Sequence, residues 1–174
     1  MNIQLKNSKY HYGAIARILH WSSVIMLVAL IYLSGQFENL DQGGERSDLV
    51  NQHTSLGVLF LLLMILRLIW RGVNLNPLHS YNLHSWQKKL AFIIHRLIYF
   101  VLIFECLIGL FILFAVGGII IYFNFEIGGS FTKNAFLSQV AIDLHRWVSF
   151  LVYPLLALHI SAAIYHQIFG VVDD

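Results

Sequence analysis

The segment 139-QVAIDLHRWVSFLVYPLLALHISAAIYHQIF-169 decides the fold of this chain. It is mainly apolar and exceeds the about 20 residues that an α-helix needs to cross the hydrocarbon core of a bilayer. Its two inner histidines, His145 and His159, are fourteen residues apart. At about 100° and 1.5 Å per residue, they face the same side of a helix at depths about 21 Å apart. The segment therefore predicts a membrane-spanning helix with two polar side chains at two depths.

The composition of the whole chain agrees with a membrane location. Of its 174 residues, 58% are hydrophobic and 11% are charged, with a mean hydropathy of +0.70. Ordinary soluble domains have about a quarter of their residues charged, so this class is excluded. The net charge of +2 is too small for the basic surface that nucleic acids require. The single cysteine, Cys106, can form neither an internal disulfide nor a zinc cluster.

Four stretches of the chain are long and apolar enough to cross the lipid bilayer. We expect membrane-spanning helices at about residues 15–35, 52–71, 88–116 and 139–169. The prediction is one all-α domain, residues 1–174, folded as an integral membrane four-helix bundle. The first helix has a long apolar run without a small-residue cleavage site after it, so we expect it to be retained rather than removed as a signal peptide.

The connections between these helices carry recognisable breaks. Residues 36–48 are polar and predict a solvated loop, and Pro77 closes the second helix. The Gly117–Gly118 pair is expected to end the third helix. The apolar run 119–125 is too short to cross, so we expect it to pack at the membrane surface as a loop, with a strand-like lid as the alternative.

Basic residues near the helix ends predict the orientation, because cytoplasmic loops carry an excess of Lys and Arg. Arg46 and Lys133 lie on the side away from the termini. Six basic residues lie on the side of the termini: Lys6, Lys9, Arg17, Arg71, Lys88 and Lys89. Both termini are therefore expected in the cytoplasm (N-in/C-in).

Four histidines occupy the predicted helices at two matched depths. An ionisable side chain inside a membrane needs a partner and indicates a functional site. His20 lies near the start of the first helix, and His53 near the start of the second, which enters from the opposite face. Antiparallel packing then lets His53 meet His145 and lets His20 meet His159.

Facing imidazoles between helices point to haem. Two neutral imidazoles across a bundle are the usual axial ligands of a haem iron, so two pairs predict two haems stacked across the membrane. A hydrogen-bonded packing role is the plainer explanation for any single histidine. A zinc or copper transporter is a further alternative, but such sites usually include Cys, Met or carboxylates.

Five more residues are candidates for the haem surroundings. Arg67, Arg96 and Arg146 could bind haem propionates, because guanidinium groups pair with carboxylates in a bidentate manner. Snorkelling toward lipid headgroups is the alternative for Arg67 and Arg96. Gly57 and Gly109 could let a porphyrin edge approach the helix, or could simply allow close helix packing.

Three polar residues have roles that the sequence leaves open. Glu105 is the most deeply placed carboxylate, and we expect a hydrogen-bonded structural acid, with a proton route as the alternative. His95 is expected near a haem without binding its iron. His166 is expected to face water, with proton transfer to a quinone as the alternative.

The chain resembles the bacterial cytochrome b561 family, and more broadly the cytochrome b subunits of nickel-iron hydrogenases and formate dehydrogenases. The resemblance covers nearly the whole chain and rests on the order and spacing of the His20-Trp21 pair, His53, the segment from His95 to Tyr99, Gly109, His145 and His159. In that family the positions matching the four paired histidines bind two b-type haems, in agreement with the pairing above. The apolar run 119–125 and an acidic tail depart from the family pattern.

The resemblance implies a di-haem cytochrome of the bacterial inner membrane that carries single electrons between an unknown donor and the quinone pool of a respiratory chain, with ubiquinone as the expected quinone. A superoxide oxidase is one alternative, in which Lys133, Arg46 and Arg146 attract periplasmic superoxide and ubiquinone receives its electron. A membrane-anchoring subunit that docks a larger dehydrogenase or hydrogenase is another. The sequence decides neither whether the chain is an enzyme nor whether it forms a homodimer.

Overall fold

The fold is a bundle of four long helices with one short hairpin. The computed structural model describes residues 4–75, 77, 84–122, 125–128 and 132–169. In chain order its elements are α1 (Ala14–Glu38), α2 (Gly44–Val73), α3 (Ser85–Ala115), β1 (Ile119–Tyr122), β2 (Phe125–Gly128) and α4 (Ala135–Phe169). All four helices are long and apolar enough to span a membrane. The predicted membrane four-helix bundle is confirmed.

The link between α1 and α2 is shorter than the sequence predicted. A solvated loop over residues 36–48 was expected, but α1 continues to residue 38 and α2 begins at residue 44. Glu45 lies in the first turn of α2, where a carboxylate is stabilised by the positive end of the helix dipole. Polar residues at this link therefore extend the helices beyond the apolar segments instead of forming a long loop.

The break after α3 occurs where the two glycines predicted it. Gly117 adopts a left-handed conformation with φ 67°, which glycine reaches without the penalty of a Cβ atom. The backbone N–H of Gly118 donates to the carbonyl of Leu113 at 2.9 Å, and that of Gly117 donates to Phe114 at 3.1 Å. This pair of bonds is a Schellman motif, which satisfies the last carbonyls of the helix.

The apolar run 119–125 contributes to a hairpin, so the strand-like alternative holds and the loop expected there is wrong. β1 and β2 pair antiparallel, with Ile119 opposite Gly128. β1 also contacts α2. Pairing within the hairpin satisfies backbone groups that a loop at the membrane surface would leave without partners.

Asn134 ties the start of α4 to the end of α3. Its backbone N–H donates to the carbonyl of Ala115 at 2.9 Å, and its side-chain oxygen accepts from the N–H of Leu137 at 3.0 Å. Asparagine is a preferred residue at this capping position because it satisfies an N–H that has no partner within the helix. The cap explains why α4 begins a few residues before the predicted position at 139.

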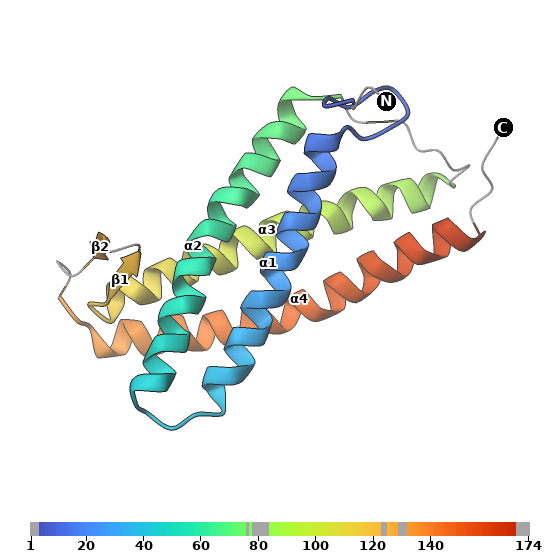
Figure 1. Cartoon of the computed structure of the whole chain (residues 1–174). Helices are drawn as coiled ribbons and strands as arrows, with labels where there is room; N and C mark the ends of the chain where they lie inside the picture. The colour runs from blue at the N-terminus through green and yellow to red at the C-terminus, as the bar shows by residue number, and fades with distance from the viewer. Residues whose placement is uncertain (1–3, 76, 78–83, 123–124, 129–131, 170–174) are drawn as a thin grey trace.

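The helices form two antiparallel pairs, α1 with α2 and α3 with α4, and α2 also packs against α3 (Figure 1). The two pairs cross, and they diverge toward the end that holds the start of α1 and the end of α4 (Figure 1). We call this the His20 end, and we call the opposite end, where α1 joins α2, the His53 end. The hairpin lies at the His53 end (Figure 1).

The buried core lies midway between these ends. Phe60 and Met64, one turn apart on α2, are each only 1% exposed. Along α2 they lie between His53 and Arg67. They pack with buried residues from the other three helices, namely Leu30, Val101, Leu102 and Val152. An apolar layer therefore separates the polar side chains at one end of the bundle from those at the other.

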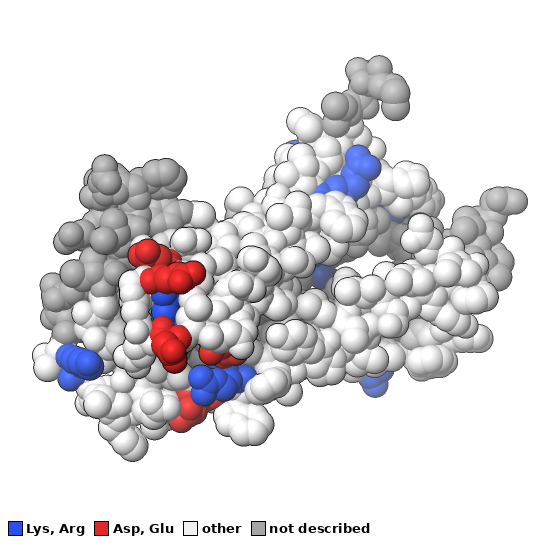
Figure 2. Space-filling view, turned by 60° about the horizontal axis from the view of Figure 1, so that its bottom comes forward, with Lys and Arg blue, Asp and Glu red and all other residues white. Residues whose placement is uncertain are grey.

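The outer faces of the helices are apolar as well. Ile25, Phe100 and Trp147 are 68%, 65% and 72% exposed. Such residues would be unfavourable in water but contact lipid in a bilayer. The charged side chains gather instead toward the ends of the bundle (Figure 2).

The central layer yields a stability prediction. Phe60→Ala should lower the free energy of unfolding by about 3 kcal/mol, the lower end of the range for a buried phenylalanine, because in a membrane the loss is mainly one of packing. Leu62→Ala, on the same helix but 58% exposed, serves as the control. Thermal unfolding in detergent, followed by helical circular dichroism, should separate the two variants. Equal destabilisation would show that Phe60 is not part of the core.

Candidate functional site

At the His53 end, α2 and α4 bring two imidazoles close together, with their rings nearly perpendicular. The ring centres of His53 and His145 are 6.4 Å apart, with the rings inclined at 89°. The Nδ1 atom of His53 lies 3.1 Å from the carbonyl oxygen of Leu30 on α1. A carbonyl only accepts, so this Nδ1 carries the hydrogen and the Nε2 lone pair is free to bind a metal.

The side of α3 that faces His145 holds a carboxylate and a glycine. Glu105 places an Oε1 atom 3.4 Å from the Nδ1 atom of His145. A Cβ atom on Gly109 would lie 3.4 Å from Cε1 of the same ring, so this glycine makes room for the imidazole. The other glycine candidate, Gly57, has Leu30 at ordinary packing distance. The structure thus places Gly109, but not Gly57, directly against a candidate ligand.

At the His20 end, α1 and α4 form the second predicted pair. The ring centres of His20 and His159 are 6.4 Å apart, at an angle of 70°. His95 on α3 adds a third imidazole, with its ring centre 5.0 Å from that of His159. Its Nδ1 donates to the Ala91 carbonyl one turn earlier, at 2.7 Å. His95 therefore lies beside this pair of histidines.

Arg67 reaches into the same cluster from α2. Its guanidinium lies 2.6 Å from the Nδ1 atom of His20 and donates to the hydroxyl of Ser23 at 2.8 Å. Guanidinium only donates, so the Nδ1 of His20 accepts and a neutral ring carries its hydrogen on Nε2. Binding of a metal at Nε2 would move that hydrogen to Nδ1 and release Arg67 from the ring. The released guanidinium could then pair with a carboxylate.

The two other arginines lie away from the paired histidines. Arg96 stacks over the ring of Phe92 at 4.2 Å. Arg146 lies 3.7 Å from Glu38 and 3.8 Å from Asp143, and its side chain is 56% exposed. Among the described contacts, neither arginine touches a paired imidazole, so the structure does not bring them to the site.

The paired histidines fit haem on two counts. With metal–imidazole bonds of about 2 Å and about 1 Å from each nitrogen to its ring centre, an iron between two imidazoles separates their centres by about 6 Å. Both pairs have this spacing. Among the described residues, no group of three or more His, Cys, Asp and Glu side chains is placed to hold a metal ion. Two protein ligands suffice for haem because the porphyrin supplies the other four.

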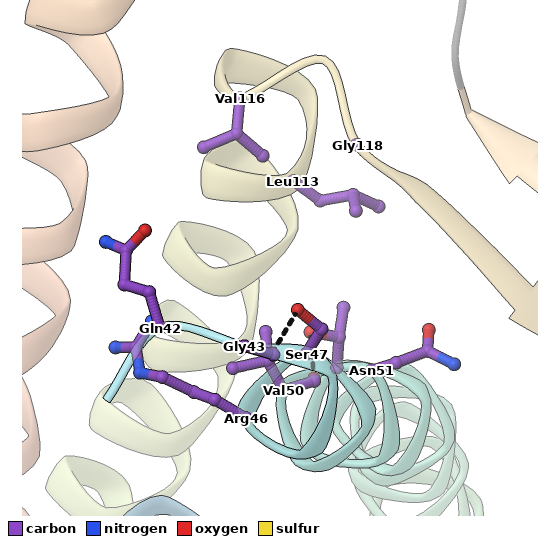
Figure 3. A pocket seen from close by; sticks show the side chains of 10 residues that line it. Gln42, Gly43, Arg46, Ser47, Val50, Asn51, Leu113, Val116 and Gly118 are labelled. Atoms are coloured by element: carbon purple, nitrogen blue, oxygen red, sulfur yellow. Dashed lines mark hydrogen bonds between the residues drawn. The ribbon is translucent and has the colours of Figure 1, made fainter. Parts of the chain in front are cut away.

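A separate pocket of about 330 Å³ opens at the His53 end, between the first turns of α2 and the end of α3 (Figure 3). Arg46, Ser47 and Asn51 line it from α2. The Nε of Arg46 donates to the carbonyl of Phe37 at 3.1 Å, and the ring of Phe37 lies 5.5 Å from that of His53. The pocket is thus adjacent to the pair formed by His53 and His145. Its cationic side chain, Arg46, is already hydrogen-bonded to a backbone carbonyl.

Several contacts of the histidines were not predicted from the sequence. The Leu30 carbonyl is a backbone group and leaves no trace in residue types. Ser149 donates a hydrogen bond to Glu105, and Ser23 accepts one from Arg67. Ser149 follows His145 by one helical turn, and Ser23 stands three residues after His20, so small polar residues at helical spacing from a histidine were a usable signal.

Comparisons with known proteins agree with this geometry. The sequence profile of the family described as prokaryotic cytochrome b561 matches residues 11–172. Cytochrome b561 homolog 1 of Escherichia coli (strain K12) is 24% identical over 151 residues, covering 86% of this chain and 85% of the relative. Cytochrome b561 homolog 2 of the same organism is 25% identical over 166 residues, covering 92% and 87%. The chain therefore belongs to the prokaryotic cytochrome b561 family of membrane cytochromes, which implies b-type haem and electron transfer.

Proposed function

We propose that this chain is a di-haem electron carrier in which His53 and His145 bind one b-type haem and His20 and His159 bind the other. The supporting observation is that both pairs, which share α4 but lie at different depths, have the same 6.4 Å spacing of ring centres. A packing role alone would not require two pairs to share this spacing. Haem, when bound, supplies the one-electron chemistry.

The protein residues orient the ligands and keep the sites apart. The Leu30 carbonyl fixes the ring of His53 through Nδ1, a common way to hold a ligating histidine. Phe60 and Met64 fill the layer between the two pairs and exclude water from it. Two imidazoles per site leave no position for an exogenous ligand, which favours electron transfer over oxygen binding.

We further propose that the His20 end faces the cytoplasm of a bacterium and that the chain lies in the inner membrane. The excess of Lys and Arg on the side of the termini supports this orientation. The quinone pool of a respiratory chain, such as ubiquinone, is the proposed redox partner. An electron that enters at either pair would cross most of the bilayer through the apolar core.

The superoxide alternative receives little support from the charges at the His53 end. Acidic and basic side chains are mixed there (Figure 2). Arg146 lies beside Glu38 and Asp143, and Arg46 binds a backbone carbonyl. These contacts weaken the cationic field that would attract an anion. Superoxide oxidation, a docked redox subunit and a homodimer stay predictions.

Haem counting after histidine replacement tests the pairing. The unaltered protein should contain two b haems per chain in a pyridine haemochrome assay. His53→Ala and the double variant His53→Ala/His145→Ala should both retain one, because they empty the same site. The double variant His53→Ala/His20→Ala should contain none.

His84→Ala, an exposed residue at the start of α3, is the control and should retain two haems. Loss of both haems from the within-pair double variant would contradict the pairing. Absence of haem from the unaltered protein, purified from cells with ample haem, would overturn the proposed function itself.

Gly109 provides a steric test of the His53 end. Gly109→Val should displace the ring of His145, because even a Cβ atom would lie 3.4 Å from Cε1, and one of the two haems should be lost. Gly72→Val on α2 makes the same replacement where no atom lies within 4 Å, and should retain both. The assay is again haem per chain. Two haems in Gly109→Val would show that the ring position is not set by this contact.

The redox partner can be tested with the oxidised protein in detergent. A soluble ubiquinol should reduce both haems, measured by the growth of the α-band of reduced b haem. The double variant His53→Ala/His20→Ala should give no such band. Reduction by enzymatically generated superoxide, faster than spontaneous dismutation and without reduction by the quinol, would instead favour the superoxide oxidase.

A further inference from the structure

Glu105 is a carboxylate placed in the most apolar of the four helices. The best window of α3 has a mean hydropathy of 2.8, and the side chain of Glu105 is only 13% exposed. Carboxylates in membrane spans are rare and face a partner or a polar cavity. No lysine or arginine makes an ion pair with Glu105 among the described residues, so its position has to be explained by the groups that it does contact.

Those groups belong to one stretch of α4. Ser149 donates its hydroxyl hydrogen to Oε1 of Glu105, and the same Oε1 lies 3.4 Å from Nδ1 of His145. Ser149 follows His145 by one turn, and its hydroxyl also lies 2.9 Å from the His145 carbonyl. Gly109, one turn after Glu105 on α3, leaves the space that the imidazole occupies. Two residues of α3 and two of α4 thus form one contact around this ring.

Two buried polar atoms at this contact have no hydrogen bond of good geometry. They are Nδ1 of His145 and Oε2 of Glu105. A buried polar atom without a partner is unfavourable, and a small rotation of either side chain would let the imidazole donate to the carboxylate. His145 and Glu105 are therefore complementary: one has an unused donor and the other an unused acceptor.

The two histidines of this pair differ in what faces their Nδ1 atoms. His53 donates to the neutral carbonyl of Leu30, whereas His145 faces a carboxyl group. When a ligating histidine donates its second N–H to a carboxylate, the ring is fixed in orientation and becomes a stronger donor to the metal. A stronger donor stabilises the more positively charged, oxidised iron, and so lowers the reduction potential.

We propose that Glu105 is a positioning residue for His145: it accepts the Nδ1 hydrogen of this ligand, fixes the plane of its ring and lowers the reduction potential of the haem at the His53 end. This inference rests on the proposed function, because it requires that His145 binds haem. Glu105 would thus make the reduction potentials of the two haems different, which the four histidines alone do not do.

Glu105→Gln is the direct test, because glutamine keeps the size of the side chain but cannot form a carboxylate. The variant should retain two haems, and redox titration followed at the α-band should show that one haem has a higher midpoint potential while the other is unchanged. The shifted haem should be the one that is lost in His53→Ala. The low-spin g-values of the same oxidised haem should change in electron paramagnetic resonance spectra, because its ligand field is weaker.

Asp143→Asn is the matched control. It removes the same charge two residues before His145 on α4, from a side chain that is 50% exposed and has no contact with the imidazole among those described. Its potentials should stay near those of the unaltered protein. An equal shift in both variants would mean that only general charge matters, and would overturn the role of Glu105.

Ser149→Ala provides a second variant with the opposite expected sign. Without the hydroxyl, Oε1 of Glu105 accepts a hydrogen bond from His145 only. That bond should be stronger, so the midpoint potential of the haem at the His53 end should fall. A general loosening of the helix contact would move both variants in one direction. If Glu105→Gln loses this haem, a fall in Ser149→Ala still supports the proposal, and a rise or no change overturns it.

Failure of this inference is distinct from failure of the proposed function. Two haems with unchanged potentials and spectra in Glu105→Gln would refute the role of Glu105 and leave the di-haem carrier intact. A protein without haem would refute the carrier itself.

Discussion

A ring nitrogen buried between membrane-spanning helices needs a partner, and the arrangement of this protein follows from that constraint. Lipid offers no hydrogen bonds, so a buried imidazole has to find its partner within the protein. His53 on α2 uses a carbonyl of α1, and His20 on α1 uses a guanidinium of α2. These contacts join the α1–α2 pair at both ends, and the facing histidines of α4 connect it to the other pair.

The apolar layer between the two histidine levels has a complementary role. Phe60 and Met64 are the most buried large side chains described, and they lie where the crossing helix pairs meet. Helices in lipid associate through packing rather than through a hydrophobic driving force, so a well-filled centre is needed to hold the crossing. The same layer keeps water from passing between the sites, which lets each site have its own polar surroundings.

Those surroundings differ in chemistry. A guanidinium, that of Arg67, contacts His20, whereas a carboxyl group, that of Glu105, faces His145. Different polar side chains beside otherwise similar histidine pairs are a simple way to give two haems different affinities for an electron. A chain with two such sites can then favour one direction of electron movement without any additional cofactor.

Length and hydropathy alone determined the four helices, because a fixed bilayer thickness requires apolar segments of a fixed length, and the Gly117–Gly118 break followed from backbone conformation. The histidine pairs were also predictable, since helical periodicity fixes both the direction and the depth of a side chain. The hairpin was not, because a short apolar run fits a loop or a strand equally well. Only the tertiary structure decided what contacts each ring: the Leu30 carbonyl has no signature in a sequence, and Glu105 and Gly109 meet His145 only once α3 packs against α4. Partners that come from another helix depend on how the helices pack, which no single segment encodes.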